Sequence, residues 1–245
     1  MIIAGGIKRI EDWYCKAGPK DRDAQWEDDH SAKEFAKLWF NKKQIKIPHG
    51  IDRQISMIFP NFRYQFLIPE HITALDRYPG GQRNHDLLIY GKIENKEDGI
   101  ICIEAKATES LDSTIEDKYA SVTNNASSNL PKRIDQMLAY FNVVKEAVKN
   151  LRYQLFTGLY GTICEAKNQQ VSKCIFMTVQ LITNKTKEKE IEETKKDIEL
   201  FLSVLGGIDT TGFETNEYFR QIKVKDDNLN VFLSYLQIDV RYTRT

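Results

Sequence analysis

Hydrophobic residues along the chain change repeatedly between helical and strand-like spacing. Phe35, Leu38 and Trp39 fall on one helical face, which predicts a helix over 31–41, and a short helix is expected at 50–58. Strands are expected at 63–75 (interrupted by Pro69), 85–92, 100–108, 172–184 and 229–241. Further helices are expected at 111–121, from Pro131 to 149, at 151–166 and at 186–204.

This order of elements predicts the fold class. The strands at 85–92 and 100–108 are joined by a turn near 95–99, which indicates a β-hairpin. The later strands are separated by helices, so a mixed central sheet with helices on both sides is expected, in the α/β class. We expect one domain over 1–245, with an irregular segment at 1–30, a core at 34–140 and the rest of the sheet and its flanking helices in 150–245.

Charged residues occur at adjoining ends of this otherwise apolar hairpin. Side chains alternate across a strand, so Glu104 and Lys106 point to the same side. Asp86 stands at the start of the preceding strand, and in an antiparallel hairpin that start lies beside the end of the partner strand. We therefore expect Asp86 roughly opposite Glu104, with Lys106 next to both.

Two carboxylates and an ammonium group in one partly buried place favour metal chemistry. Burying such charges costs several kcal/mol per ion unless something compensates them. A magnesium ion prefers one or two carboxylates together with waters and phosphate, and Asp86 and Glu104 could supply those ligands. Lys106 could then orient a water, help to deprotonate it, or neutralise developing negative charge.

The spacing of Asp86, seventeen residues and then Glu104-Ala105-Lys106 resembles the PD-(D/E)xK nuclease superfamily, also called restriction-endonuclease-like. His85 stands where the family pattern has proline. Gln136-Met-Leu-Ala-Tyr140 is similar to the QxxxY motif of the RecB-like branch. Glu34 occupies a place where many members have a helix glutamate.

The resemblance implies a restriction-endonuclease-like fold and a metal-dependent nuclease that cleaves nucleic acid, with DNA expected before RNA. It implies Mg²⁺, with Mn²⁺ as a substitute. Asp86 and Glu104 would bind metal with the help of Glu34, and Lys106 would be catalytic. Gln136 and Tyr140 would orient the site or contact substrate.

Each of the residues in these motifs also has a simpler interpretation. Glu104 and Lys106 could form a surface ion pair, and Asp86 could cap a turn after Asn84. Glu34 could complete a capping box with Ser31. Gln136 could be a partly exposed polar residue, and Tyr140 could be a core position.

Further polar residues could contact phosphate: Arg83, His85 and Arg133, and also Lys42, Lys43 and Lys46. For each of them a solvated surface charge is the favoured interpretation. His85 could instead be a histidine packed within its strand.

Composition narrows the function only a little. The 35 basic and 35 acidic residues sum to zero, so net charge neither favours nor excludes nucleic acid. The four cysteines contain no CxxC pair, and no apolar run is long enough for a signal peptide or a membrane span, so a cytoplasmic protein is expected. A homodimer or a partner subunit stays open. One alternative function is a catalytically inactive, nuclease-like protein that binds nucleic acid or serves as a scaffold. A more distant alternative is an interaction protein of the α/β class with no nucleic-acid role.

Overall fold

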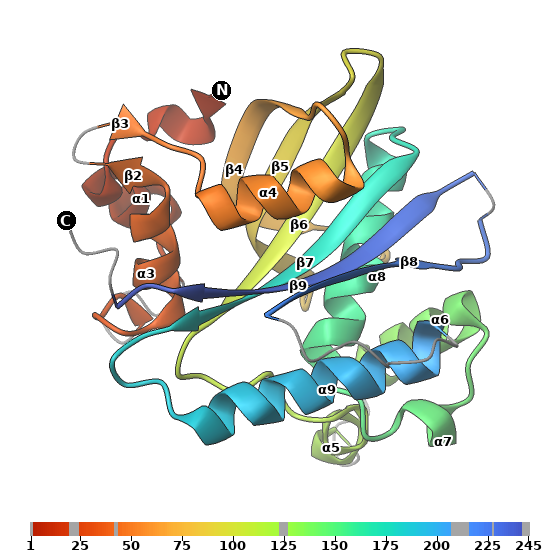
Figure 1. Ribbon diagram of the computed structural model, residues 1–245. Helices are drawn as coiled ribbons and strands as arrows, with labels where there is room; N and C mark the ends of the chain where they lie inside the picture. Colours follow the sequence, from red (N-terminus) through yellow and green to blue (C-terminus); the bar gives the residue numbers. More distant parts are fainter. Residues whose placement is uncertain are drawn as a thin grey trace.

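The computed structural model describes residues 2–19, 25–41, 44–122, 127–206, 216–226 and 228–241 (Figure 1). Within them, seven strands form one sheet: β1 (Ile2–Ile3), β4 (Arg63–Thr73), β5 (Arg83–Ile93), β6 (Glu97–Lys106), β7 (Lys173–Ile182), β8 (Glu217–Ile222) and β9 (Asn230–Asp239). The short strands β2 (Phe40–Asn41) and β3 (Gln44–Ile45) pair separately. The helical elements are η1 (Ala4–Gly6), α1 (Ile10–Ala17), α3 (Ser31–Leu38), α4 (His49–Ile58), α5 (Ile115–Ser121), α6 (Leu130–Phe141), α7 (Lys145–Val148), α8 (Tyr153–Asn168) and α9 (Glu188–Gly206).

The predicted mixed sheet flanked by helices is confirmed. The strand order is β1-β4-β5-β6-β7-β9-β8. β4, β5 and β6 form an antiparallel meander, whereas β7 pairs parallel to β6 and β9 parallel to β7. The connection from β6 to β7 carries α5 to α8, and such helical crossovers are what parallel neighbours require.

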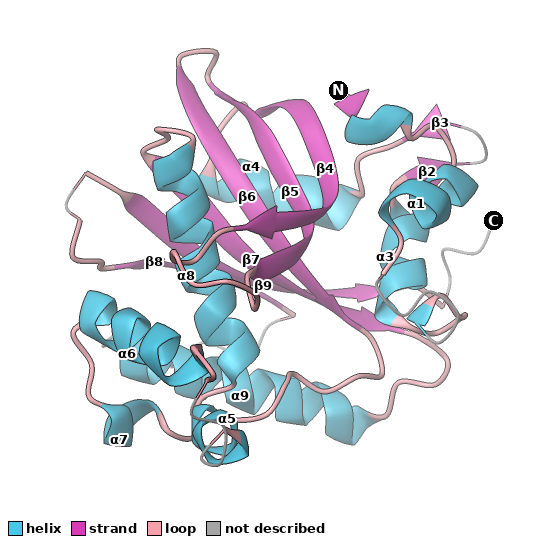
Figure 2. Ribbon diagram, turned by 180° about the vertical axis from the view of Figure 1, so that it is seen from behind, coloured by secondary structure: helices cyan, strands magenta, loops and turns pink. Residues whose placement is uncertain are grey.

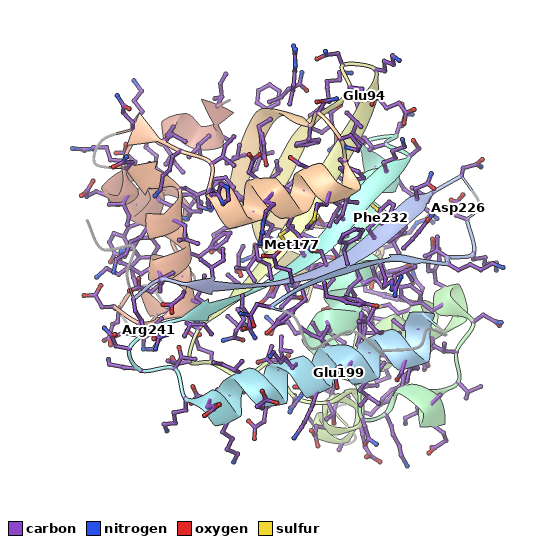
Figure 3. All side chains as sticks on the ribbon, in the orientation of Figure 1. Glu94, Met177, Glu199, Asp226, Phe232 and Arg241 are labelled. Atoms are coloured by element: carbon purple, nitrogen blue, oxygen red, sulfur yellow. The ribbon has the colours of Figure 1, made fainter. Side chains whose placement is uncertain are left out.

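Two hydrophobic cores lie on opposite faces of the sheet. One core packs α1, α3 and α4 against the sheet, and the other packs α5 to α9 against its second face (Figure 2). Met177 of β7 and Phe232 of β9 point into the layer between the sheet and α4 (Figure 3). The central strands are apolar on both faces because both faces are covered.

The predicted hairpin is present, with a tighter turn than expected. Glu94 and Asn95 both have positive φ, at 49° and 61°, and the Lys96 amide donates to the Ile93 carbonyl at 2.9 Å. Two left-handed central residues are typical of the type I′ turn that joins twisted strands. The turn, at Glu94 in Figure 3, lies at the end of the hairpin opposite to Asp86.

Several sequence expectations are wrong. The helix expected from Pro131 to 149 ends at Phe141, where Asn142 takes the left-handed conformation with φ 53°. The segment 1–30 is not irregular throughout, because it contains α1, although residues 20–24 lie outside the described part. Strand β8 was not expected at all.

Pro69 does not interrupt β4. The only described strand on the outer side of β4 is β1, which pairs with Phe66 and Leu67 alone. Pro69 therefore lies on a stretch of edge strand, where the missing N–H costs no ladder hydrogen bond. In the described residues, no helix has the length and apolar character needed to cross a membrane.

Candidate active site

A cavity of about 1100 Å³ opens where the β5–β6 hairpin meets α8. Its walls come from the β4–β5 connection, the start of α3, the end of β6 and the first turn of α8. Asp86, Glu104 and Lys106 all line it, so the structure brings the three predicted residues into one recess.

The hairpin register explains how Asp86 reaches Glu104. The β5–β6 ladder runs from Ile93 opposite Glu97 to Leu87 opposite Ile103, and the next position along the ladder sets Asp86 beside Glu104. Here the Asp86 Oδ2 atom accepts a hydrogen bond from the Ala105 amide at 2.6 Å. The Asp86 carboxylate thus takes the place of a backbone acceptor and is fixed against β6.

The side chains of β4 and β5 change faces next to the site. Leu87 and Ile89 of β5 lie in the α3–α4 core, yet His85 lies against Gly161 of α8 on the opposite face. In β4, Glu70 has a φ of 50°. Ile68 before it and His71 after it both lie on the α8 side of the sheet, although a spacing of three residues in a regular strand would put them on opposite faces. Irregularities of this kind re-aim side chains near functional sites. Strict alternation of side chains therefore breaks down at Asp86, which reaches Glu104 through the pairing of the hairpin strands.

Glu104 is buried, with 2% of its surface exposed, and its carboxylate accepts from three side chains. Lys106 Nζ lies 2.9 Å from Oε1, which also accepts from the Gln154 amide. Arg83 forms an ion pair with Oε2. Each donor comes from a different element: β5, β6 and α8.

The two facing carboxylates have opposite pKa shifts. Burial raises the pKa of Asp86 well above its usual value, and the negative charges of Glu104 and Glu70 add to that effect. Burial also works to raise the pKa of Glu104, but Lys106 and Arg83 outweigh it and the net pKa is lowered. The cations thus compensate Glu104 and leave Asp86 with too little positive charge.

Lys106 remains an ammonium group in this setting. Burial alone would lower its pKa, but Glu104 and Asp86 outweigh that effect and raise it. Only 12% of its side chain is exposed. The interpretation of Glu104 and Lys106 as a surface ion pair is therefore wrong, because Glu104 is buried and Lys106 is largely covered.

Glu70 is a third carboxylate at the cavity that the sequence analysis did not select. It lies between two β4–β5 pairs, Pro69 with Leu87 and His71 with His85, which sets it across from Asp86. Burial raises its pKa to about 7, and the charge of Glu104 contributes. No motif indicates Glu70, because only the irregular φ of this residue brings it to the site.

Gln154 was also missed, and the contact of Arg83 with Glu104 was not expected. Arg83 was considered as a phosphate contact or a solvated surface charge, but only 7% of it is exposed and it pairs with Glu104. Lys42 and Lys43 lie outside the described residues. Gln154 stands 50 residues from Glu104 and arrives from the first turn of α8. A contact over such a separation leaves no local signal in the sequence.

Glu34 is buried, but its hydrogen-bond partners do not line the cavity. Its Oε1 accepts from the Asp29 amide at 2.9 Å and from Lys37 at 2.7 Å. The capping box with Ser31 is wrong, since the cap residue is His30 and Ser31 binds Glu109 instead. The described cavity lining does not include Glu34, so the metal-binding role expected for Glu34 is not supported.

Gln136 and Tyr140 likewise do not reach the cavity walls in the described part of the chain. Gln136 donates to the hydroxyl of Tyr160 at 3.1 Å. The ring of Tyr140 packs against Tyr160 with 5.4 Å between ring centroids, and Lys167 lies over it. The QxxxY-like residues therefore join α6 to α8, and a direct role at the carboxylates is not supported.

Arg133 lies at the cavity, whereas His85 does not. Arg133 lines the cavity and is buried rather than solvated, with Nη2 donating to Asp76 Oδ1 at 3.0 Å and to the Gly80 carbonyl at 2.9 Å. His85 is fully buried away from the cavity lining, and neither ring nitrogen has a partner within the described residues. Burial, with Arg83 and His71 nearby, holds the pKa of His85 well below its usual range. Its packed-strand interpretation agrees with this position.

A family model described as a domain of unknown function, DUF6946, matches residues 6–239, which is nearly the whole chain. The chain belongs to the DUF6946 family. No curated protein and no solved structure matches it.

Few side chains at the cavity of this DUF6946 chain are arranged so that they could bind a metal ion. Across the described ranges, no three His, Cys, Asp or Glu side chains are arranged as a ready metal cluster. Asp86 and Glu104 remain as a facing pair, with Asp86 held through Oδ2 by the Ala105 amide and Glu104 held by Lys106. Two carboxylates that leave room for water and phosphate match the way Mg²⁺ is usually held.

Proposed function

We propose that this chain is a metal-dependent nuclease of the PD-(D/E)xK type, which hydrolyses phosphodiester bonds of nucleic acid, with DNA as the expected substrate. One observation carries the proposal: Asp86 and Glu104 adjoin at the end of the hairpin, in an open recess, with Lys106 bonded to Glu104. The mixed sheet agrees with the fold that the resemblance implies. A cytoplasmic location, and a homodimer or a partner subunit, belong to the same proposal.

The site fits a divalent cation. Asp86 has a raised pKa because it is buried next to two other carboxylates, and a cation between Asp86 and Glu104 would relieve that repulsion. Asp86 and Glu104 would hold the ion, with Mg²⁺ expected and Mn²⁺ as a substitute. When bound, the ion would supply charge stabilisation to the phosphate and lower the pKa of a water.

The remaining side chains have positioning and charge-neutralising roles. The Ala105 amide fixes Asp86, and the Gln154 amide fixes Glu104. Of the three roles open to Lys106, neutralisation of negative charge on the phosphate fits best, because its raised pKa keeps its proton in place. Proton abstraction by Lys106 is disfavoured for the same reason.

A second candidate function is nucleic-acid binding without cleavage. The observation that favours it is the number of donors on Glu104, since Arg83, Lys106 and Gln154 already occupy both of its oxygens. A carboxylate satisfied in this way has less capacity for a metal ion. Such a protein would retain nucleic acid and show no turnover with any metal.

The two candidates are separated by a cleavage assay on single- and double-stranded DNA and RNA with MgCl₂ or MnCl₂. Replacement Lys106→Ala removes the ammonium beside Glu104 and should lower the rate by about 10²–10³-fold. Lys92→Ala is the matched control, because Lys92 pairs with Asp98 at 2.8 Å near the far end of the same hairpin. Cleavage that survives Lys106→Ala, or is absent with every metal, would reject the nuclease proposal.

A further inference from the structure

The environment of Glu104 contains a charge that the proposed reaction does not need. Lys106 already neutralises this carboxylate at 2.9 Å, and Arg83 adds a second cation on the other oxygen. Once a metal ion has displaced the proton from Asp86, Arg83 and Lys106 balance the charges of Asp86 and Glu104, so these four groups together have no net charge. A divalent cation therefore meets a neutral cluster rather than an anionic one.

Arg83 is held in place by its packing. Its guanidinium donates through Nη2 to Glu104, whereas its buried Nε has no hydrogen-bond partner among the described residues. A Cβ on Gly161 of α8 would stand 2.8 Å from the Arg83 Cγ atom, so the helix packs directly on the arginine stem. Arg83 also lines the cavity, together with Glu104.

We propose that Arg83 is the built-in counter-ion of Glu104 and that a divalent cation must displace it in order to bind there. The inference rests on the proposed function, because it takes Glu104 as a metal ligand. Arg83 is then a positioning residue: it keeps Glu104 ionised and in place without a metal, at the expense of metal affinity. The same carboxylate oxygen cannot serve both partners fully, so the guanidinium and the metal compete.

Competition of this kind has a distinct signature. In most metal sites, removal of a residue near the ligands weakens metal binding, because outer contacts orient the ligands. Here, removal of Arg83 leaves the cluster with one net negative charge and frees Glu104 Oε2. Attraction between unit charges near a protein surface is large enough that Arg83→Gln should bind the cation about tenfold more tightly.

The test is calorimetric titration of MnCl₂ into the full chain without nucleic acid. We expect tighter binding for Arg83→Gln and near wild-type binding for Arg83→Lys, which keeps the charge. Lys118→Gln is the matched control, because Lys118 lines the same cavity but pairs with Asp112 at 2.8 Å. Equal or weaker Mn²⁺ binding by Arg83→Gln, or an equal gain in Lys118→Gln, overturns the inference.

A second measurement covers loss of folding. If Arg83→Gln is unfolded in EDTA, the proposal predicts that MnCl₂ restores its thermal unfolding transition, because a ligand of the native state stabilises it. Failure of Mn²⁺ to restore folding overturns the proposal. Gln154→Leu removes a neutral donor from Glu104 and should change the affinity for Mn²⁺ much less than Arg83→Gln does.

The outcomes also distinguish this inference from the proposed function. Tighter Mn²⁺ binding by Arg83→Gln without nucleic-acid cleavage by the wild type would reject the nuclease and keep the counter-ion. Cleavage that depends on Lys106, with no gain in Mn²⁺ affinity on Arg83→Gln, would reject the counter-ion alone. A wild-type chain and an Arg83→Gln variant that both bind no Mn²⁺ would reject both.

Discussion

Asp86 and Glu104 lie next to each other on neighbouring strands, but the positions of the nearby cations give the two carboxyl groups different protonation states. Arg83 and Lys106 both contact Glu104, so this carboxylate stays ionised. Burial and two neighbouring carboxylates favour a proton on Asp86. Asp86 is therefore the group whose charge depends most on an added cation, and Glu70 shares its shift.

The raised pKa of Glu70 predicts a pH dependence of stability. Its pKa moves from 4.5 to about 7 on folding, so the native state binds the proton more tightly than the unfolded chain. This contribution is fully present below about pH 4.5 and is lost as the pH rises to about 7, so the free energy of unfolding should fall over that range. Asp86 acts in the same direction.

Urea unfolding in EDTA at a series of pH values measures this slope for wild type and for Glu70→Gln. The replacement removes the titrating group, so the variant should lose less stability between the two pH limits. Glu188→Gln, at the exposed start of α9, is the control and should keep the wild-type profile. A Glu70→Gln profile parallel to that of wild type would contradict the prediction.

Residue-level prediction succeeded where local geometry decides the outcome. Glu104 and Lys106 could be grouped from strand alternation, and Asp86 could be added from the hairpin pairing. Glu70 depends on an irregular φ, and Gln154 on the docking of α8, which no local pattern encodes. Glu34, Gln136 and Tyr140 were selected by resemblance, and their observed partners lie elsewhere.

At the scale of elements, α8 connects the core to the site. Its first turn carries Gln154, its middle packs on Arg83 and Phe176 through Gly161 and Gly158, and most of its residues are buried. Glycine at these two positions lets the helix approach the sheet closely. The distance between α8 and β5 therefore sets the position of Arg83 relative to Glu104.

Gly161→Ala should destabilise the protein, although alanine normally favours a helix by about 1 kcal/mol. The added Cβ would lie 2.8 Å from Arg83 Cγ and 3.1 Å from His85 Nε2, and overpacking costs about 1–3 kcal/mol. Gly50→Ala in α4 is the matched control, since its Cβ would meet Leu236 at an ordinary 3.6 Å. Thermal unfolding should show a loss for Gly161→Ala and none for Gly50→Ala; a stabilised Gly161→Ala would refute this account of helix packing.

Helices and strands were predicted most accurately where the hydrophobic periodicity of the sequence is strongest. The long apolar strands β6 and β7 were expected within a few residues of their observed bounds. The end of α6 was missed because Asn142 breaks the helix by adopting a left-handed conformation, and the apolar stripe continues into α7. The short edge strand β8 has few buried residues, so its hydrophobic pattern is weak.

At the scale of the whole molecule, the cavity lies where structures from both faces of the sheet meet. Glu109, after β6, accepts from the Ser31 amide at 3.0 Å and from the Ala107 amide at 3.1 Å. It thereby ties the start of α3, on one face, to the end of the strand that carries Glu104 and Lys106. The α5–α9 layer closes the cavity from the other face. A site assembled from both layers cannot be predicted from any single segment of the sequence.

The charge distribution predicts a weak dependence of nucleic-acid binding on salt. The net charge is zero, and four cavity cations already have carboxylate partners: Arg83, Lys106, Lys118 and Arg133. Each phosphate that a protein neutralises contributes about −0.7 to the slope of log K against log salt for single strands and about −0.9 for duplexes. Paired cations offer little to phosphate, so a slope shallower than about −3 is expected for the wild-type chain.

Fluorescence anisotropy of labelled DNA in EDTA, where a metal-dependent enzyme cannot cleave, measures this slope across NaCl concentrations. A slope steeper than about −5 would instead require many unpaired cations outside the cavity, and with them a binding surface much larger than the recess around Asp86 and Glu104.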